Sequence, residues 1–334
     1  MTTITVLGAG AWGTALAVGL ARQGRRVTLC ARRGDHVAAM RAQRENASYL
    51  RGVALPESLE LSDRWVDAAR ASEVVLMAVP SRFARAAMTP VRCEIGAGTT
   101  LISATKGIED DSLKTMTAML AEVAPAVKRL AVLSGPSFAA EVARGKPAAV
   151  VAAASDEPVS RKVQELFASR SLRVYRSSDV HGVELAGAAK NVIAIAAGIS
   201  DGMGLGLSAR AALITRGLAE LARLVLQAGA RAETIYGLAG LGDLVLTCTG
   251  DLSRNRSLGL KIGQGENAAS VSGVSAPGQP VAEGASNARS IRRLAEHMGV
   301  EMPIVTAVCR VLYEGAAANA MVEELLNREL KAEF

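Results

Sequence analysis

Aromatic residues are scarce in this chain of 334 residues, because phenylalanine, tryptophan and tyrosine together account for 3% of it. Proteins that bind single-stranded nucleic acid stack the bases on aromatic side chains. The arginines are also scattered along the chain instead of forming a basic tail, so we expect no nucleic-acid partner. The net charge of +6 indicates small anionic ligands or, alternatively, only a mixed solvated surface.

Histidine and cysteine are also rare. The three histidines stand alone, without the spacing of metal ligands, so we expect no metal. The four cysteines, Cys30, Cys93, Cys248 and Cys309, lie far apart and form no C-x-x-C motif, which is typical of reduced thiols in a cytoplasmic protein. The first residues predict a strand rather than a charged and then apolar leader, so nothing indicates secretion.

A membrane span is not expected either. The apolar run over residues 183–200 has Lys190 and Asn191 at its middle. A charged side chain at that depth of a bilayer is costly, so the pattern excludes an integral membrane segment. Attachment to a membrane surface stays open as a weaker alternative.

The most informative stretch that is present lies near the start of the chain. The apolar, β-branched residues 4–7 run into Gly8-Ala9-Gly10-Ala11-Trp12-Gly13, and helix-forming residues 14–21 follow. This is the strand, turn and helix context that a G-x-G-x-x-G dinucleotide motif needs. Gly8 allows the sharp turn, Gly10 lets a pyrophosphate approach the backbone, and Gly13 lets the helix lie close to the strand. The alternative is a purely structural glycine turn.

The residues after the second expected strand bear on the choice of cofactor. An NAD site usually has an acidic residue about 20 positions beyond the glycines, which binds the ribose 2′-hydroxyl. Here the strand over residues 26–30 is followed by Arg32 and Arg33, with no carboxylate until Asp35. Two guanidinium groups suit a 2′-phosphate, so we predict NADPH as the preferred cofactor, with NADH still open. The alternative is that both are ordinary loop arginines.

Strand and helix patterns alternate as far as residue 180 and then give way to helices. This predicts a doubly wound, mostly parallel sheet of the Rossmann type over residues 1–180, followed by an all-α domain over residues 181–334. The expected strands of the sheet, besides the first two, are residues 74–81, 99–103, 130–133, 148–154 and 172–175.

Lys190 is the candidate acid and base. It lies inside a long apolar helix predicted over residues 181–200, and its neighbours on the same face are Ala186, Gly187, Ile193 and Ala194, none of them a carboxylate. Apolar surroundings lower the pKa of a lysine, which suits proton transfer near neutral pH. The alternative is a lysine whose ammonium group extends to the surface.

Four further motifs are candidates for substrate binding: three could hold an anion or a ligand oxygen, and Asp243 could orient a lysine or bind a substrate hydroxyl. Lys106 follows the carboxyl end of an expected strand, where open α/β sheets bind ligands. The turn 135–137 exposes backbone N–H groups, and a glycine-rich loop presents Asp243. Ser253-Arg254-Asn255 combines a hydroxyl, a guanidinium and an amide at an expected helix start. The alternatives are a solvated lysine, a helix cap at Asp243 and a simple N-cap at Ser253.

Taken together, these motifs resemble one family, the NAD(P)-dependent glycerol-3-phosphate dehydrogenases of the bacterial type. The resemblance covers essentially the whole chain, and the order and spacing of the motifs agree with the family. It rests on residues 8–16, Ala104-Thr105-Lys106-Gly107, 134–139, 190–195, 240–244 and Ser253-Arg254-Asn255.

The resemblance implies a cytoplasmic oxidoreductase that reversibly reduces dihydroxyacetone phosphate to sn-glycerol 3-phosphate for phospholipid synthesis. It implies that the helical domain is of the 6-phosphogluconate-dehydrogenase-like type and that Lys190 is the general acid/base. Implied substrate-binding residues are Lys106, Gly135, Ser137, Lys190, Asp243, Ser253, Arg254 and Asn255. Implied cofactor-binding residues, together with Gly8, Gly10 and Gly13, are Ala11, Trp12, Arg32, Arg33, Lys106, Ala139, Arg254, Val281 and Glu283.

The sequence departs from the family pattern in two places. Ala11 stands where many members have serine, so one side-chain contact to phosphate is missing while the backbone N–H remains. The loop before Val281 is rich in alanine, glycine and proline, which bears on the assignments of Val281 and Glu283. Members of the family often form homodimers, which leaves the oligomeric state open here.

Two other classes of protein stay open at this point. A related β-hydroxyacid dehydrogenase would share the fold but take a carboxylate substrate. A non-catalytic nucleotide sensor could keep the dinucleotide motif, although a lysine within an apolar helix argues against it.

Overall fold

The computed structural model describes residues 2–271, 282–330 and 332–333. The chain forms two compact units. The first comprises Met1–Gly187 and Glu233–Asp243, and the second comprises Ala188–Ala232 and Leu244–Phe334. The division into residues 1–180 and 181–334 that the sequence suggests stays a prediction.

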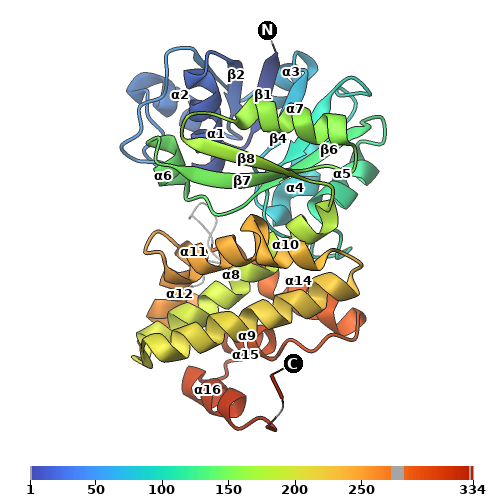
Figure 1. Cartoon of the computed structure of the whole chain (residues 1–334). Helices are drawn as coiled ribbons and strands as arrows, with labels where there is room; N and C mark the ends of the chain where they lie inside the picture. The colour runs from blue at the N-terminus through green and yellow to red at the C-terminus, as the bar shows by residue number, and fades with distance from the viewer. Residues whose placement is uncertain (1, 272–281, 331, 334) are drawn as a thin grey trace. The chain divides into compact units, whose positions relative to one another are not determined.

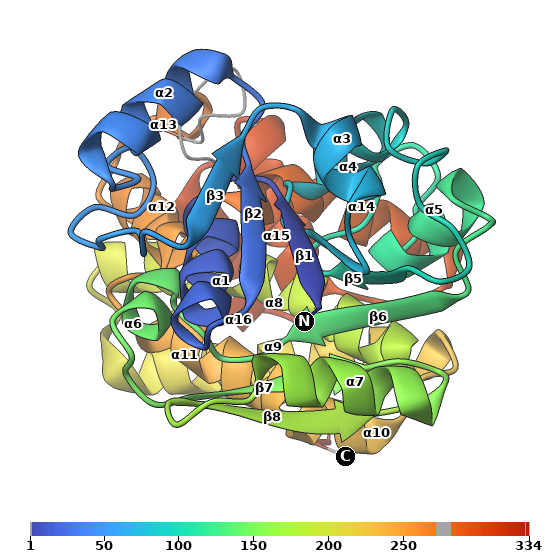
Figure 2. The same cartoon turned by 90° about the horizontal axis from the view of Figure 1, so that it is seen from above.

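The first unit is built on an eight-stranded sheet in the order β3-β2-β1-β4-β5-β6-β7-β8. Neighbouring strands are parallel except for the antiparallel pair β6 and β7. Figure 2 shows β3, β2 and β1 side by side. The predicted doubly wound, mostly parallel sheet is therefore confirmed. The strands are β1 Thr3–Leu7, β2 Arg26–Cys30, β3 Leu59–Ser62, β4 Val74–Met77, β5 Thr100–Ser103, β6 Arg129–Ser134, β7 Ala148–Ala153 and β8 Leu172–Ser177.

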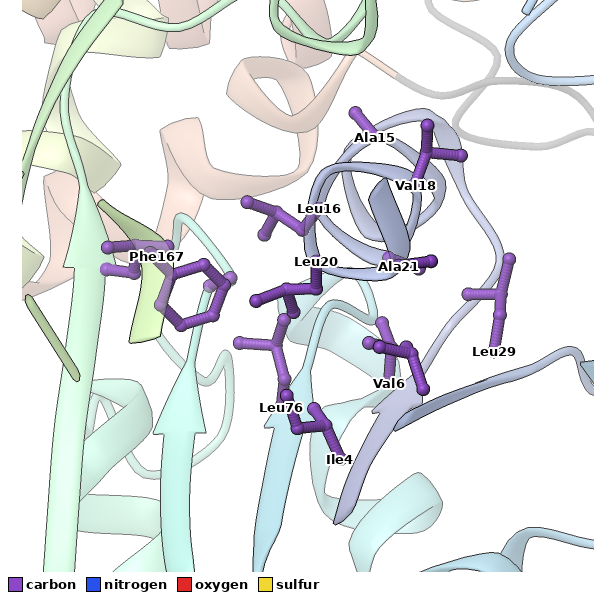
Figure 3. Packing of buried hydrophobic residues seen from close by; sticks show 14 of the residues in the cluster. Ile4, Val6, Ala15, Leu16, Val18, Leu20, Ala21, Leu29, Leu76 and Phe167 are labelled. Carbon is purple, nitrogen blue, oxygen red and sulfur yellow. The ribbon is translucent and has the colours of Figure 1, made fainter. Parts of the chain in front are cut away.

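Each face of the sheet is covered by helices, because successive side chains of a strand point to opposite faces. Val74 and Leu76 of β4 belong to the core under α1 and α7, whereas Val75 and Met77 belong to the core on the side of α4 and α5. In Figure 3 Leu16 and Leu20 of α1 lie toward Leu76 and toward Phe167 of α7. The helices of this unit are α1 Ala11–Arg22, α2 Gly34–Gln43, α3 Trp65–Arg70, α4 Ser81–Met88, α5 Met116–Val123, α6 Ala139–Ala143, α7 Glu157–Phe167, most of α10 Ala232–Tyr236, and the π-helix η1 Leu238–Gly242.

Every regular element of the second unit, as far as the structure describes it, is a helix. The predicted helical second half is thus confirmed. Helix α8 begins in the first unit and ends in the second, and the long helix after it is α9 (Figure 1). The helices are α8 Val180–Gly202, α9 Gly206–Gln227, α11 Asp243–Thr249, α12 Arg254–Gly263, α13 Ala268–Val271, α14 Glu283–His297, α15 Pro303–Tyr313 and α16 Ala318–Leu326.

Helices α8 and α12 pack at very short range through glycines. A Cβ atom placed on Gly198 of α8 would lie 2.0 Å from the carbonyl oxygen of Arg256, and one on Gly259 of α12 would lie 2.0 Å from that of Ile195. The same holds one turn further along each helix, at Gly202 and Gly263. Glycine is therefore required on both helices for their backbones to approach this closely.

Among the described residues, α8 is the one helix long and apolar enough to cross a membrane. Its most apolar stretch of 18 residues is wholly buried within the protein. The apolar composition of α8 is thus accounted for by packing in the protein core.

Candidate active site

The turn between β1 and α1 has the geometry that the glycine motif predicts. Gly8 has φ +112°, and a Cβ atom there would lie 2.7 Å from the carbonyl oxygen of Ala78. A Cβ on Gly13 would lie 2.0 Å from the carbonyl oxygen of Gly8. At Gly10, in contrast, no atom lies within 4 Å of the Cβ position, so the backbone there faces open space.

The residues of this turn fit the pyrophosphate of a dinucleotide. Gly10 is the N-cap of α1 and provides no side-chain cap, so the N–H groups of the first turn are available to an anion. Ala11 and Trp12 begin the helix, and both pack against the core beneath it. Strand β1 pairs with β2 on one side and β4 on the other, where the strand order reverses and open sheets bind their ligands.

Arg32 and Arg33 follow the carboxyl end of β2, and both are exposed. Arg33 is the N-cap residue of α2, and its Nε lies 3.0 Å from Oδ1 of Asp35 in an ion pair between two exposed side chains. An exposed pair of this kind contributes little to stability. The two guanidinium groups therefore remain candidates for binding a 2′-phosphate.

Four of the predicted substrate residues come together in the first unit. Lys106, just after β5, donates through Nζ to Oδ2 of Asp243 at 2.6 Å and to the carbonyl oxygen of Gly135 at 3.1 Å. The hydroxyl of Ser137 donates to the same carbonyl at 3.0 Å. Gly135 has φ +138°, and a Cβ there would lie 2.9 Å from the Cα of Val150, so only glycine suits this position. The side chain of Asp243 is 2% exposed, and Lys106 compensates its charge.

Lys190 is buried, with 4% of its surface exposed. Its Nζ donates to Oγ1 of Thr247 on α11 at 2.6 Å. Lys190 is thus buried as expected, and a hydroxyl that the sequence analysis did not expect contacts its amine. Sequence analysis missed Thr247, yet a signal was present: it lies four residues after Asp243, on the same face of one helix.

Ser253, Arg254 and Asn255 begin α12 and differ in what their side chains contact. Ser253 is the N-cap, and its Oγ accepts from the backbone N–H of Arg256 at 3.2 Å. Asn255 is buried, donates to Oδ1 of Asn191 at 3.0 Å and accepts from the N–H of Gly284 at 2.9 Å. Arg254 is exposed. Ser253 thus caps α12 itself, Asn255 joins α12 to α8 and α14, and Arg254 provides an accessible cation between them.

The remaining predicted residues lie on separate elements. Ala139 is the first residue of α6, and Glu283 is the first residue of α14. Val281 lies outside the described residues. Within the described part of the chain, no group of three or more histidine, cysteine, aspartate or glutamate side chains could hold a metal ion.

Sequence analysis also missed two buried glutamates that cap helices from a distance. Glu184 of α8 accepts from the N–H of Thr117 at 2.8 Å and from its hydroxyl at 2.5 Å, at the start of α5. Glu220 of α9 accepts from the N–H groups of Ile304 and Val305, at the start of α15. Burial raises the pKa of Glu184 and raises that of Glu220 to about 7. The signal in the sequence is an isolated acid in an apolar helical stretch.

Family models, related sequences and a solved structure all relate this chain to glycerol-3-phosphate dehydrogenases. The family models for the N-terminus and the C-terminus of NAD-dependent glycerol-3-phosphate dehydrogenase match residues 3–160 and 179–323. A glycerol-3-phosphate dehydrogenase [NAD(P)+] of Geobacter sp. (strain M21) is 51% identical over 332 residues, 99% of this chain and 98% of the relative. One of Anaeromyxobacter dehalogenans (strain 2CP-C) is 49% identical over 99% of both chains. The crystal structure of glycerol-3-phosphate dehydrogenase from Coxiella burnetii has a TM-score of 0.92 and 41% identity, covering 98% of this chain and 99% of its own.

Proposed function

This chain belongs to the NAD-dependent glycerol-3-phosphate dehydrogenase family, and from that premise we propose how its residues divide the reaction among them. The protein is an oxidoreductase that uses NAD(P) and interconverts dihydroxyacetone phosphate and sn-glycerol 3-phosphate, which supplies glycerophospholipid synthesis. Its substrate is a small molecule. The roles of individual residues below are our proposal.

Lys190 is the general acid/base. When bound, the nicotinamide ring supplies or accepts the hydride. Lys190 donates a proton to the oxygen on C2 during reduction and takes it back during oxidation. The observation that carries this role is the burial of a lysine, 4% exposed, within the apolar helix α8. Its ammonium group also stabilises the negative charge that develops on the oxygen, and Thr247 holds its Nζ in place at 2.6 Å.

The other substrate residues hold the ligand's polar groups. Lys106 and Asp243 form an ion pair in which Asp243 is buried and Lys106 is partly buried, and this contact orients both side chains toward the substrate. Arg254, exposed at the first position of α12, binds the phosphate together with the N–H groups of that helix start. Ser253 and Asn255 shape the same turn, and Gly135 and Ser137 hold Lys106 through the carbonyl of Gly135.

The cofactor-binding residues include the turn after β1 and the two arginines after β2. Gly8, Gly10 and Gly13, with the backbone of Ala11 and Trp12, bind the pyrophosphate, and Arg32 and Arg33 favour NADPH over NADH. The open space before Gly10 and the exposure of both arginines support this assignment. We further propose that the cofactor is contacted by Lys106, Ala139, Arg254, Val281 and Glu283.

Substitution of Lys190 by alanine tests the proposal. We expect the variant to bind NADPH with unchanged affinity and to lose turnover of dihydroxyacetone phosphate by about 10³-fold or more, because both proton transfer and charge stabilisation are removed. Fluorescence titration measures binding, and NADPH oxidation measures turnover. A matched control is Lys261→Ala on α12, whose lysine is exposed. Turnover retained by Lys190→Ala would refute the assigned role.

We also propose a cytoplasmic location and a homodimer. All four cysteines are free in the structure, which suits a reducing compartment. Light scattering across a range of protein concentrations tests for the homodimer, and a molecular mass equal to that of one chain at every concentration would contradict it.

A further inference from the structure

Lys106 sits in the connection between β5 and α5, residues 104–115, which has no helix or strand of its own. Gly107 follows it with φ +150°. A glycine in this conformation gives the backbone freedom next to the lysine. The position of the Lys106 backbone, from which its side chain reaches Asp243 and Gly135, therefore depends on what fixes the connection on either side of that glycine.

On the amino-terminal side, the connection is tied to the segment that follows β4. The hydroxyl of Thr105 donates to the carbonyl oxygen of Val79 at 2.7 Å, and Thr105 is 7% exposed. This bond fixes the residue directly before Lys106.

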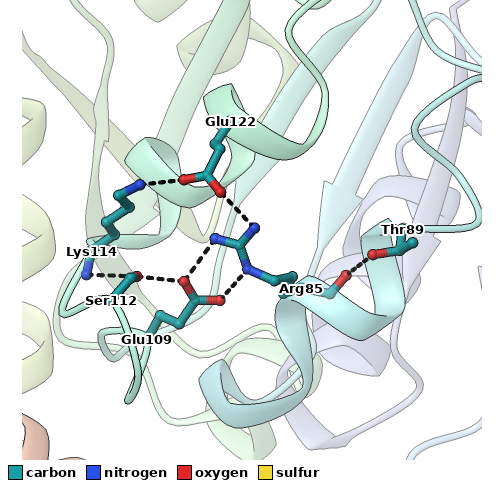
Figure 4. Close-up of polar contacts among 6 residues, drawn as sticks. All are labelled: Arg85, Thr89, Glu109, Ser112, Lys114 and Glu122. Atoms are coloured by element: carbon teal, nitrogen blue, oxygen red, sulfur yellow. Dashed lines mark hydrogen bonds and ion pairs between the residues drawn. The ribbon is translucent and has the colours of Figure 1, made fainter.

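On the carboxyl-terminal side, Arg85 of α4 holds Glu109 with two parallel hydrogen bonds (Figure 4). Its Nε lies 2.7 Å from Oε1, its Nη2 lies 2.8 Å from Oε2, and the side chain of Glu109 is 13% exposed. The third guanidinium nitrogen, Nη1, donates to Glu122 of α5 at 2.8 Å. Ser112 and Lys114 complete the network by bonds to Glu109 and Glu122, respectively.

The backbone of the connection is closed by the same residues. The N–H of Glu109 donates to the carbonyl oxygen of Lys114, and the N–H of Leu113 donates to that of Glu109, both at 2.9 Å. Arg85 thereby fixes the turn over residues 109–114. It belongs to the segment 79–85, whose residue Val79 also binds Thr105. Isolated surface ion pairs contribute little, but a bidentate arginine in a network restricts geometry as well.

We propose that Arg85 is a positioning residue for Lys106: through its two-point contact with Glu109 it sets where the Lys106 ammonium group is presented to the phosphorylated substrate. This inference rests on the role proposed above for Lys106 in substrate binding. In the described part of the chain, the side chain of Arg85 bonds to Glu109 and Glu122, so we infer that it acts on Lys106 through the connection.

The test compares Arg85→Lys with Arg70→Lys. Lysine keeps the charge but cannot make two parallel bonds. Arg70 of α3 forms an ion pair of similar length with Glu94, 2.7 Å from Nε to Oε2, in the same unit but outside the connection. We expect Arg85→Lys to raise the KM for dihydroxyacetone phosphate about 10-fold, while kcat and the KM for NADPH change less than about 2-fold. Arg70→Lys should leave all three unchanged, and Glu109→Gln should follow Arg85→Lys.

Hydrogen exchange provides a readout that does not depend on turnover. The amides of Glu109 and Leu113 should exchange faster in Arg85→Lys than in the wild type or in Arg70→Lys. An unchanged KM in both Arg85→Lys and Glu109→Gln would overturn the proposal, as would an equal loss of kcat and rise of both KM values. If the wild-type enzyme did not oxidise NADPH with dihydroxyacetone phosphate, the proposed function would be refuted. In that case hydrogen exchange still tests the present inference, because unchanged exchange of the Glu109 and Leu113 amides in Arg85→Lys would overturn it.

Discussion

At the scale of single residues, the two arginines that we propose to set cofactor choice could be identified without a structure. Arg32 and Arg33 were found because an expected carboxylate is missing after the second strand, and the structure leaves both exposed there. The spacing of Asp243 and Thr247 places Thr247 on the same helix face as a predicted site residue, but its contact with Lys190 and the contacts of Asn255 could not be foreseen. The partners Thr247, Asn191 and Gly284 come from other helices, and no periodicity in the sequence relates Lys190 or Asn255 to them.

We predict that replacing Arg32 and Arg33 by alanine lowers kcat/KM for NADPH by about 10-fold or more and leaves that for NADH within about 3-fold, because only NADPH carries the 2′-phosphate. Initial rates with dihydroxyacetone phosphate and each cofactor check this. Arg26→Ala, at the opposite end of β2, is the control and should change neither value. A strong preference of the wild-type enzyme for NADH would contradict the argument.

Among the elements, the long helices and every strand except β3 were predicted, whereas β3 was not expected and the packing of the elements could not be predicted. The apolar runs and the glycine turn near the start of the chain are local patterns, so they specify β1, α1 and the buried strands. The close approach of α8 and α12 is different. Gly198 lies in the apolar helix predicted over residues 181–200 and Gly202 lies just beyond it, and their pairing with Gly259 and Gly263 becomes apparent only when both helices are in place.

This contact gives a prediction about stability. Gly259→Ala should destabilise the protein by about 2–3 kcal/mol, because its Cβ would lie 2.0 Å from the carbonyl oxygen of Ile195 and force the helices apart. Gly19→Ala in α1 is the matched control, since no atom outside its own helix lies within 4 Å of its Cβ position. That change should leave stability equal or raise it by up to about 1 kcal/mol. Urea denaturation measures both, and equal effects of the two substitutions would contradict the prediction.

At the scale of the whole molecule, the pH dependence of stability should carry a contribution from Glu220. Its pKa is about 7 in the folded protein against 4.5 for an unburied glutamate. Between these values the folded state keeps a proton that the unfolded state has lost. The contribution of Glu220 to stability therefore falls as pH rises from about 4.5 to about 7, and it is constant outside that range.

Glu220→Gln should remove this contribution, because the amide keeps an acceptor for the N–H of Ile304 without ionising. Relative to the wild type, the variant should gain stability between pH 5 and pH 8, by at most about 3 kcal/mol. Denaturation midpoints at several pH values measure the difference. Glu266→Gln, at an exposed position, is the control. A difference between wild type and Glu220→Gln that stays constant with pH would show that the carboxyl group does not titrate as expected.

Helix α8 also restricts how this protein can be taken apart. Its first two turns belong to the unit with the sheet, where Val183 packs with Val132 and Val151 and Glu184 caps α5. Its later turns, which include Lys190, belong to the other unit, and the helix is continuous between the two. In a hybrid enzyme joined at residue 180, the strands that contact the first turns of α8 would therefore come from a different protein than Lys190, the proposed general acid/base. A chimera of two relatives should therefore take the whole of α8 from the same parent as strands β6 and β7, which its first turns contact.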